Sequence, residues 1–204
     1  MLMDDTLSEL IERYPQLAVC QGEIAKAFDL LLTCFRSGRK VLTCGNGGSA
    51  SDSDHIVGEL LKKFRKRRSI PPDLAAHLPS DLVGRLEGSL PAVSLVSMCG
   101  ILTAFANDVS WETAFAQQVL GLGCPGDVLI ALSTSGNSVN CVNAARVAHA
   151  KGLKVIALTG AGGGQLGALA DAVIGVPERE TYRVQELHLP VYHALCAAIE
   201  DKLF

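Results

Sequence analysis

The sequence predicts an α/β fold in which helices cover both faces of a five-stranded parallel sheet. Five short apolar runs alternate with longer segments whose apolar residues recur at helical spacing, a pattern typical of parallel sheets. Three of these runs end in turns rich in Gly, Ser, Thr and Asn. Ligands of such folds bind at the carboxyl ends of the strands. These turns are therefore the first candidates for a functional site.

The composition describes one domain covering residues 1–204. Hydrophobic residues make up 49% and charged residues 19% of the chain, enough apolar material for a substantial core. The net charge of −3 and the 5% aromatic content argue against a nucleic-acid binder. No apolar run approaches the ~20 residues that cross a bilayer, and the first ten residues do not resemble a signal peptide. Seven scattered cysteines without CxxC spacing favour a reducing compartment, so we expect a cytoplasmic protein.

The individual elements follow from the apolar patterns and from the residues that interrupt them. The strands are expected at 41–44, 91–96, 128–132, 154–158 and 172–176. Helices are expected at 5–13, 98–106, 111–120 and 181–203, with one ending near 64 and one near 151. An extra N-terminal helix is expected at about 16–37, where Pro15 precedes it and Gly38 closes it.

Two segments interrupt the alternation of strands and helices. Residues 62–69 form the basic run KKFRKRRS, which we interpret as a solvated helix end, with a phosphate or acidic partner as the less favoured alternative. Residues 70–89 form an amphipathic helical insertion with leucines at four-residue spacing, Leu74, Leu78, Leu82 and Leu86. An oligomer contact and a cover over a site both fit this insertion, and the sequence does not decide between them.

The stretch around the first strand end carries the most chemistry. Three glycines at 45–48 allow positive φ and close backbone approach, and the helix that follows has Ser49, Ser51 and Asp52 as candidate N-caps. Backbone N–H groups at such a junction suit a phosphate. His55 and Glu59 then share one face of the helix, four residues apart. The alternative is a turn that needs glycine for its geometry, followed by an ordinary surface His/Glu pair.

Other candidate residues follow the later strands. STSGNS at 133–138 supplies hydroxyl and amide donors at a strand-to-helix junction, although plain helix capping is the simpler explanation. There is no GxSxG motif, so a serine hydrolase is not indicated. Asn107 and Asp108 are polar in an apolar neighbourhood between two helices. The last helix carries Gln185, His188 and His193, and lone helical histidines are more often structural than functional.

Five ordered motifs carry a resemblance to a known family. CGNGGSxxDxxH, Glu59, STSGNS, ALTGxxGG and RxQExHxxxxH are similar to the SIS (sugar isomerase) domain family, and within it most resemble the phosphoheptose isomerases. The resemblance covers about residues 15–203. It implies a three-layer sandwich with a five-stranded parallel sheet, and a homotetramer whose active sites are shared between subunits. The departure is the 70–89 insertion, which shorter relatives lack.

The resemblance also implies roles for individual residues. One zinc ion per subunit is expected at His55, Glu59, Gln185 and His193, with Glu59 and His193 as the acid/base pair. The sugar phosphate is expected to contact Asn46, Gly47, Gly48, Ser49, Glu59, Asn107, Asp108, Ser133, Thr134, Ser135, Ser138 and Gln185.

The implied reaction is conversion of sedoheptulose 7-phosphate to D-glycero-D-manno-heptose 7-phosphate through an enediol(ate). Such a reaction needs a base near carbon, an acid near the oxygens, and stabilisation of negative charge. Two other classes compete with it. A non-catalytic SIS protein, such as a phosphosugar-binding or replication-initiator-associating adaptor, would lack the catalytic Glu and His. A phosphosugar-sensing regulator would bring a DNA-binding domain. Another ketose phosphate as substrate remains open.

Overall fold

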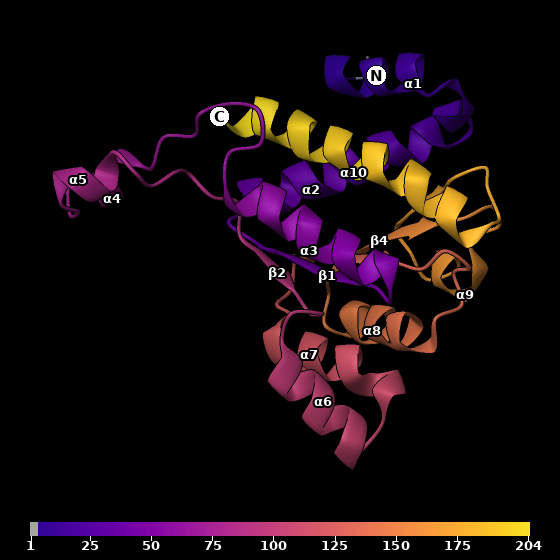
Figure 1. The fold of residues 1–204 in the computed structure, drawn as a ribbon. Coiled ribbons are helices and arrows are strands. Elements are labelled where there is room, and N and C mark those ends of the chain that lie inside the picture. The colour runs from indigo at the N-terminus through magenta and orange to yellow at the C-terminus, as the bar shows by residue number, and fades with distance from the viewer. Residues whose placement is uncertain (1–3) are drawn as a thin grey trace.

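The computed structural model describes residues 4–204, built around one parallel sheet with strand order β2-β1-β3-β4-β5 (Figure 1). The first three residues of the expected domain lie outside this range. The strands are β1 (Val41–Cys44), β2 (Ala92–Ser94), β3 (Val128–Leu132), β4 (Lys154–Thr159) and β5 (Ala172–Gly175). All four neighbouring pairs are parallel. The predicted α/β class and the five strands are confirmed.

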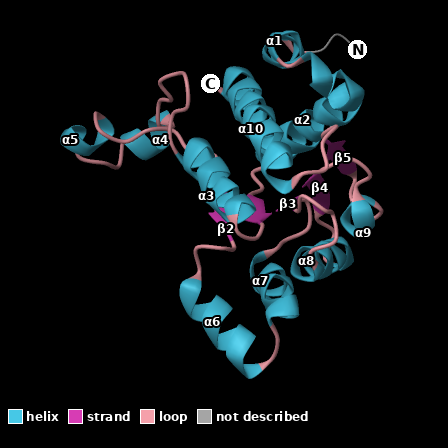
Figure 2. Cartoon of the chain, turned by 45° about the vertical axis from the view of Figure 1, so that its right-hand side comes forward, coloured by secondary structure: helices cyan, strands magenta, loops and turns pink. Residues whose placement is uncertain are grey.

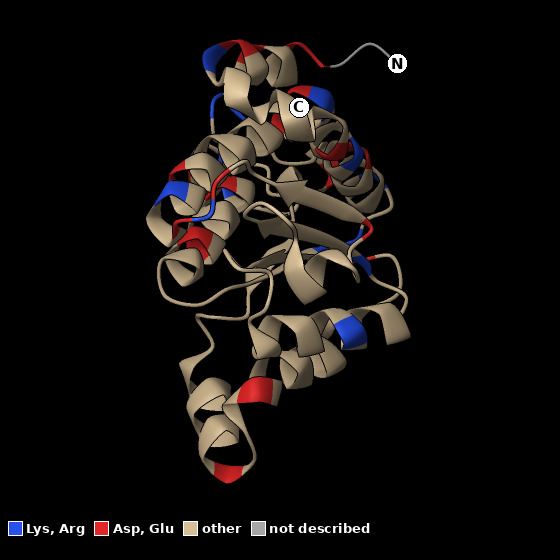
Figure 3. Cartoon of the chain, turned by 90° about the vertical axis from the view of Figure 1, so that its right-hand side faces the viewer, with Lys and Arg blue, Asp and Glu red and all other residues tan. Residues whose placement is uncertain are grey.

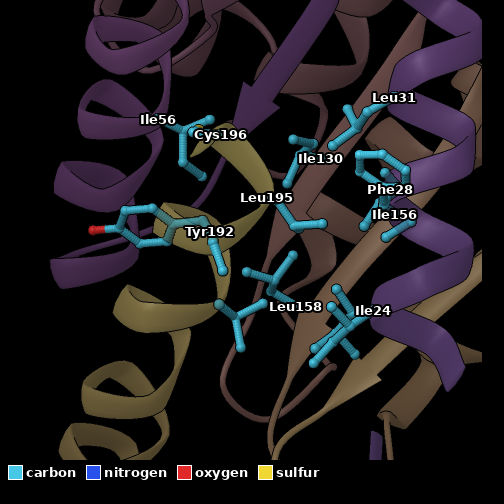
Figure 4. Packing of buried hydrophobic residues seen from close by; sticks show 14 of the residues in the cluster. Ile24, Phe28, Leu31, Ile56, Ile130, Ile156, Leu158, Tyr192, Leu195 and Cys196 are labelled. Atoms are coloured by element: carbon cyan, nitrogen blue, oxygen red, sulfur yellow. The ribbon is translucent and has the colours of Figure 1, made fainter. Parts of the chain in front are cut away.

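Helices cover both faces of the sheet, which explains why β1 and β3 are continuous apolar runs rather than alternating ones. On one face lie α1 (Asp5–Arg13), α2 (Gln21–Arg36), α3 (Gly48–Leu61) and α10 (Thr181–Leu203). On the other lie α6 (Cys99–Asp108), α7 (Ala114–Leu122) and α8 (Val139–Ala150). Each face has its own apolar core, and Figure 4 shows side chains of the first packed between α2, α3, α10 and the sheet.

Several helix boundaries differ from those expected. The N-terminal helix begins as a 3-10 turn, η1 (Pro15–Cys20), before α2 continues it. Helix α3 begins at Gly48, so Ser49, Ser51 and Asp52 lie in its first turns and none of them is its N-cap. Helix α6 extends to Asp108, and a second short 3-10 turn, η2 (Trp111–Thr113), leads into α7.

The insertion after α3 does not form one helix. It consists of α4 (Pro72–Ala75) and α5 (Ser80–Val83), which project from the body (Figures 1 and 2). Pro79 separates them, because proline lacks an N–H and its ring clashes with a preceding helical turn. The leucine spacing is therefore not a continuous stripe, and Leu74, Leu82 and Leu86 are exposed.

The basic run at 62–69 is not a helix end, because α3 ends at Leu61, and this corrects the expectation from sequence; six of its eight residues are nevertheless exposed. Five of its six cations pair with Glu or Asp side chains, three of them with side chains of α10. The ion pairs are Lys62–Glu59, Lys63–Glu87, Arg65–Asp201, Lys66–Asp201 and Arg68–Glu200. The acidic partner that was the less favoured alternative is thus supplied within the chain itself.

Charge is distributed unevenly over the two layers of helices. Figure 3 shows Lys, Arg, Asp and Glu mixed over the helices above the sheet, whereas the helices below are mostly without them. Residues 99–123, which include α6 and α7, carry only two charged side chains, Asp108 and Glu112. Within the part of the chain that is described, no helix is both long and apolar enough to span a membrane.

Candidate active site

Glycine is required at the β1–α3 junction by close packing. A Cβ on Gly45 would lie 2.5 Å from the carbonyl oxygen of Ser49, and one on Gly48 would lie 2.8 Å from Nε2 of Gln185 in α10. Gly47 has a φ of +58°. The N–H groups of Ser49 and of the next two residues donate to backbone oxygens of the same turn. This turn therefore offers fewer free donors than the sequence suggested, but it brings α3 directly against Gln185.

A side-chain link joins this turn to the next strand end. The amides of Asn46 and Asn140 exchange two hydrogen bonds, of 2.9 and 2.8 Å, between the β1–α3 turn and α8. Asn140 was missed in the sequence analysis, because an Asn in the first turn of a helix has no distinctive signal. The link holds the two donor-rich turns in a fixed relation.

The turn at 133–138 keeps hydroxyl groups at the start of α8. Ser133 and Ser138 share a hydrogen bond of 2.9 Å between their hydroxyls, and the Ser135 hydroxyl accepts from the N–H of Asn137. Gly136 has a φ of +68°, and a Cβ there would lie 1.9 Å from the carbonyl oxygen of Gly163 in the neighbouring glycine turn. The N-cap residue of α8, Ser138, makes no side-chain capping bond, but the Ser133 hydroxyl accepts from the Ser138 N–H at 3.3 Å and Oδ1 of Asn140 accepts from the Cys141 N–H at 2.9 Å. The positive end of this helix and the hydroxyl groups beside it suit an anion, although these two N–H groups already have side-chain partners.

Three titratable side chains from α3 and α10 converge about two to three helical turns beyond the start of α3. Nε2 of His55 is 3.2 Å from Oε1 of Glu59 and 3.4 Å from Nε2 of His193, which is 138 positions away in sequence. The other oxygen of Glu59 accepts from Lys62 at 2.7 Å. The structure therefore brings together the two residues expected to act as acid and base, with one further expected metal ligand between them.

The comparisons with known proteins identify the family of the chain. The SIS domain model matches residues 7–89 and 81–160. A phosphoheptose isomerase from Rhodospirillum rubrum is 40% identical over 188 residues, which is 92% of this chain and 90% of that protein. The chain belongs to the SIS-domain phosphoheptose isomerase family.

Solved structures of this family share the fold over nearly the whole chain. The phosphoheptose isomerase from Neisseria gonorrhoeae superposes with a TM-score of 0.77 and 34% identity, covering 95% of this chain and 94% of that one. A phosphoheptose isomerase from Francisella tularensis gives a TM-score of 0.78 and 32% identity, with 93% and 91% covered. The predicted three-layer SIS fold and family membership are both confirmed.

One pair of expected contact residues lies away from the rest of the site. Asn107 and Asp108 form the last turn of α6 rather than a linker between helices, and the Asn107 amide donates to Asp108 at 2.8 Å. Figures 1 and 2 show α6 projecting below the sheet, on the side opposite α3 and α10. Within one chain, Asn107 and Asp108 therefore do not reach the residues that α3 and α10 contribute to the expected phosphoheptose isomerase site.

The expected zinc ligands fit an ion only in part. A tetrahedral zinc site with bonds of about 2.1 Å places neighbouring donor atoms about 3.4 Å apart. The two contacts of His55, 3.2 and 3.4 Å, match that spacing. The amide of Gln185 instead donates to Ser49 at 3.4 Å, about 12 Å along α10 from His193 by helix rise. Among residues 4–204, no group of three or more His, Cys, Asp or Glu side chains is placed so that it could hold a metal ion, so His55, Glu59 and His193 would have to change conformation to do so.

Burial sets the protonation preferences of the groups around the site. The pKa of His193 is lowered by burial and by His55, and Glu59 partly opposes this effect. Burial raises the pKa of Asp52, and burial together with Asp52 raises the pKa of Tyr192. His188 is fully buried, which lowers its pKa to about 4, and its Nε2 donates to the carbonyl oxygen of Thr159. His188 is thus a structural histidine, which is the more common role of a lone histidine on a helix.

Two residues next to His55 were missed as functional candidates. The Tyr192 hydroxyl is 3.1 Å from Oδ1 of Asp52 and 3.0 Å from Nδ1 of His55. Asp52 lies three residues before His55, one helical turn away, and this spacing could have marked it. Tyr192 carried no such signal, because its contact with Asp52 spans 140 positions of sequence.

Proposed function

We propose that the chain isomerises sedoheptulose 7-phosphate to D-glycero-D-manno-heptose 7-phosphate through an enediol(ate). The observation that carries the proposal is the convergence of Glu59, His55 and His193 from α3 and α10. Relatives named phosphoheptose isomerase, 40% identical over nearly the full chain, support it.

In this proposal Glu59 acts as the general base. Its carboxylate removes a proton from C1 of the open-chain ketose and returns it to C2 of the aldose. The ion pair with Lys62 holds the carboxylate in place, and its side chain is only 13% exposed. A positioned general base of this kind contributes roughly 10² to 10⁴ in rate.

His193 serves as the acid at the oxygens. Because burial lowers its pKa, the neutral imidazole is favoured, and its N–H donates to the C2 oxygen as negative charge develops there. The same ring then accepts the proton leaving the C1 hydroxyl, so that the enediol passes to the aldehyde. Proton transfers at carbon and at oxygen are thus divided between α3 and α10.

The phosphate end of the substrate is assigned to the two turns. The N-terminus of α8 and the hydroxyls of Ser133, Thr134, Ser135 and Ser138 suit a phosphate dianion. Gln185 contacts the Asn46–Ser49 turn, and Asn46 is linked to Asn140 of α8, so a sugar chain would extend from these donors toward the acid/base pair.

Zinc is proposed at His55, Glu59 and His193, with Gln185 reaching the ion after a change of side-chain conformation. The ion would supply a Lewis acid for the carbonyl and enediolate oxygens. The donor set of imidazole, carboxylate and amide supports this choice. Elemental analysis of protein purified without chelator tests it directly, and absence of zinc from fully active protein would contradict it.

The active unit is proposed to be a homotetramer with shared sites, in the cytoplasm. The α6–α7 region is apolar and nearly uncharged. Because Leu102 is the one residue of α6 that is buried, α6 offers surface for subunit packing. Such packing would let Asn107 and Asp108 of one subunit approach a site on another. Light scattering at micromolar concentration should give the mass of four chains; the mass of one chain would refute this arrangement.

The decisive experiment is turnover against a panel of heptose, hexose and pentose ketose phosphates. We expect sedoheptulose 7-phosphate to be converted fastest, with the aldoheptose 7-phosphate as product. Preference for another ketose phosphate would leave the proposed isomerisation in place and change only the identity of the substrate. The exposed 70–89 insertion is the feature of the chain that makes this second outcome worth testing. No turnover of any phosphate, with binding retained, would favour a non-catalytic SIS protein.

A further inference from the structure

A row of three side chains lies behind the acid/base pair. The Tyr192 hydroxyl sits between Oδ1 of Asp52, at 3.1 Å, and Nδ1 of His55, at 3.0 Å. The ring of Tyr192 is 2% exposed and packs with Ile56 and Leu195 in the core, while its hydroxyl points away from the other labelled side chains (Figure 4). Core packing of the ring therefore fixes the position of this hydroxyl relative to α3.

The hydroxyl has one hydrogen and two neighbours that can accept it. An ionised Asp52 can only accept, and its second oxygen is buried without a partner among residues 4–204. If Tyr192 donated to His55, the Asp52 carboxylate would lose the one side-chain donor that the structure gives it. An unsatisfied buried acceptor costs about 1–3 kcal/mol, and more when it is charged. His55 is 42% exposed and has other polar neighbours. The hydrogen therefore belongs on the Asp52 side.

We propose that Asp52 and Tyr192 hold a hydrogen on Nδ1 of His55, so that Nε2 is the nitrogen presented to the reaction site. With its own hydrogen directed at Asp52, the Tyr192 oxygen accepts the Nδ1–H of His55. The hydrogen bond at one ring nitrogen fixes the state of the other. Nε2 then presents its lone pair toward Oε1 of Glu59 and Nε2 of His193, so the 3.2 Å contact with Glu59 is not a hydrogen bond in this tautomer, and a proton donor or a cation can enter between the two groups. Tyr192 and Asp52 are positioning residues in this arrangement.

The arrangement matters for Glu59, and its functional meaning rests on the proposed isomerase activity. In the opposite tautomer, Nε2–H of His55 would donate to Glu59 at 3.2 Å. That bond would occupy a lone pair of the general base and also remove the imidazole lone pair from the site. Holding the hydrogen on Nδ1 keeps both groups available to substrate, to a proton donor or to a cation. Partners of this kind orient histidine ligands in many metal sites.

The test is ¹⁵N NMR of the full-length protein labelled at its five histidines, freed of metal with chelator, at a pH where the imidazoles are neutral. A His55→Asn variant assigns the His55 signals by their loss. In the wild-type protein we expect the hydrogen on Nδ1. In Tyr192→Phe, where the ring still packs but the acceptor is gone, we expect it on Nε2, donating to Glu59.

Two further variants sharpen this test. Asp52→Asn removes the charged acceptor, so Tyr192 is free to donate to Nδ1, and the hydrogen of His55 should again move to Nε2 with the core left intact. Tyr182→Phe is the matched control, because Tyr182 lies on the same helix, is exposed, and has its hydroxyl hydrogen-bonded to Arg183. It should give the wild-type spectrum.

A hydrogen on Nε2 in the wild-type protein would overturn the inference, and so would an unchanged His55 signal in both Tyr192→Phe and Asp52→Asn. These spectra are recorded on the resting protein without substrate. Failure of the protein to turn over sedoheptulose 7-phosphate would therefore refute the proposed function alone, and the expected spectra would still establish the state of His55.

Discussion

The buried ion pair between Arg68 and Glu200 leads to a stability prediction that can be worked from the contacts. Both side chains are 0% exposed. Glu200 accepts from Nε of Arg68 at 2.7 Å and from the backbone N–H groups of Phe64, Arg65 and Lys66 at 2.7 to 2.9 Å. Arg68 in turn donates to the carbonyl oxygens of Leu60 and Glu59, the last turn of α3. Glu200 therefore anchors the segment of chain that follows α3.

Glu200→Gln should destabilise the protein strongly. The amide keeps the shape of the carboxylate, but one of its two oxygens becomes a donor that faces other donors, and the Arg68 charge is left buried without its counterion. Breaking a buried pair in this way costs about 3–5 kcal/mol. For a chain of this size that corresponds to a fall in Tm of roughly 6 to 20 °C. Urea unfolding followed by circular dichroism, at one fixed protein concentration, measures it.

The matched control is Glu186→Gln, an exposed carboxylate on the same helix, which should change the free energy of unfolding by less than about 0.5 kcal/mol. The two effects should differ in pH dependence as well. Burial pushes the pKa of Glu200 upward, but the donors from Phe64, Arg65, Arg68 and Lys66 outweigh it, so the net pKa is lowered. Its stabilisation is therefore complete above about pH 4.3 and is lost as the pH falls toward the lowered folded value. A Glu200→Gln protein as stable as the wild type at pH 7 would refute the reasoning.

The remaining predictions concern the site itself. Glu59→Gln should lower kcat by ~10² to 10⁴ with little change in KM, because the phosphate is held elsewhere; exchange of the C1 proton with deuterated solvent at the wild-type rate would show that Glu59 is not the base. His193→Asn should lose activity comparably, and the double variant should lose little more than either single one, because the two residues serve one proton relay; additive losses in steady-state kinetics would contradict this. Gly136→Ala should destabilise by at least ~2 kcal/mol in urea unfolding, since its Cβ would overlap the Gly163 carbonyl at a positive φ, whereas Gly22→Ala in α2, with open space around it, should be neutral or stabilising.

The sequence was sufficient to predict those features that depend on a few consecutive residues. Strands β1 and β3 are apolar on both faces, so four or five consecutive residues identify each of them. The glycine turns were equally visible, and Gly47 and Gly136 have the positive φ that glycine permits. Family motifs added the correct pairing of α3 with α10, which no local pattern could have provided.

The features that were missed depend on pairs of residues far apart in the chain. Arg68 looked like one more cation in a solvated run until its partner, 132 positions away, was known. Tyr192 was not singled out in the sequence, and the structure places its ring in the core, where its hydroxyl reaches Asp52 of α3. Pro79 is a local signal that the insertion cannot form one continuous helix. The four-residue spacing of the leucines nevertheless led us to expect one helical stripe.

The contacts between α3 and α10 recur at a regular spacing that explains how the site is assembled. Gln185 of α10 meets Gly48 and Ser49 of α3, and seven residues later Tyr192 meets His55, also seven residues after Gly48. Seven residues make about two turns, so each helix presents one face to the other and both run in the same direction. Eight residues beyond Tyr192, Glu200 receives Arg68, which closes the last turn of α3. The glycine turn before α3, the cluster of His55, Glu59 and His193, and the buried Arg68–Glu200 pair are thus three successive levels of one helix pairing. A shift of α10 by a single turn would separate His193 from His55 and Glu200 from Arg68 together.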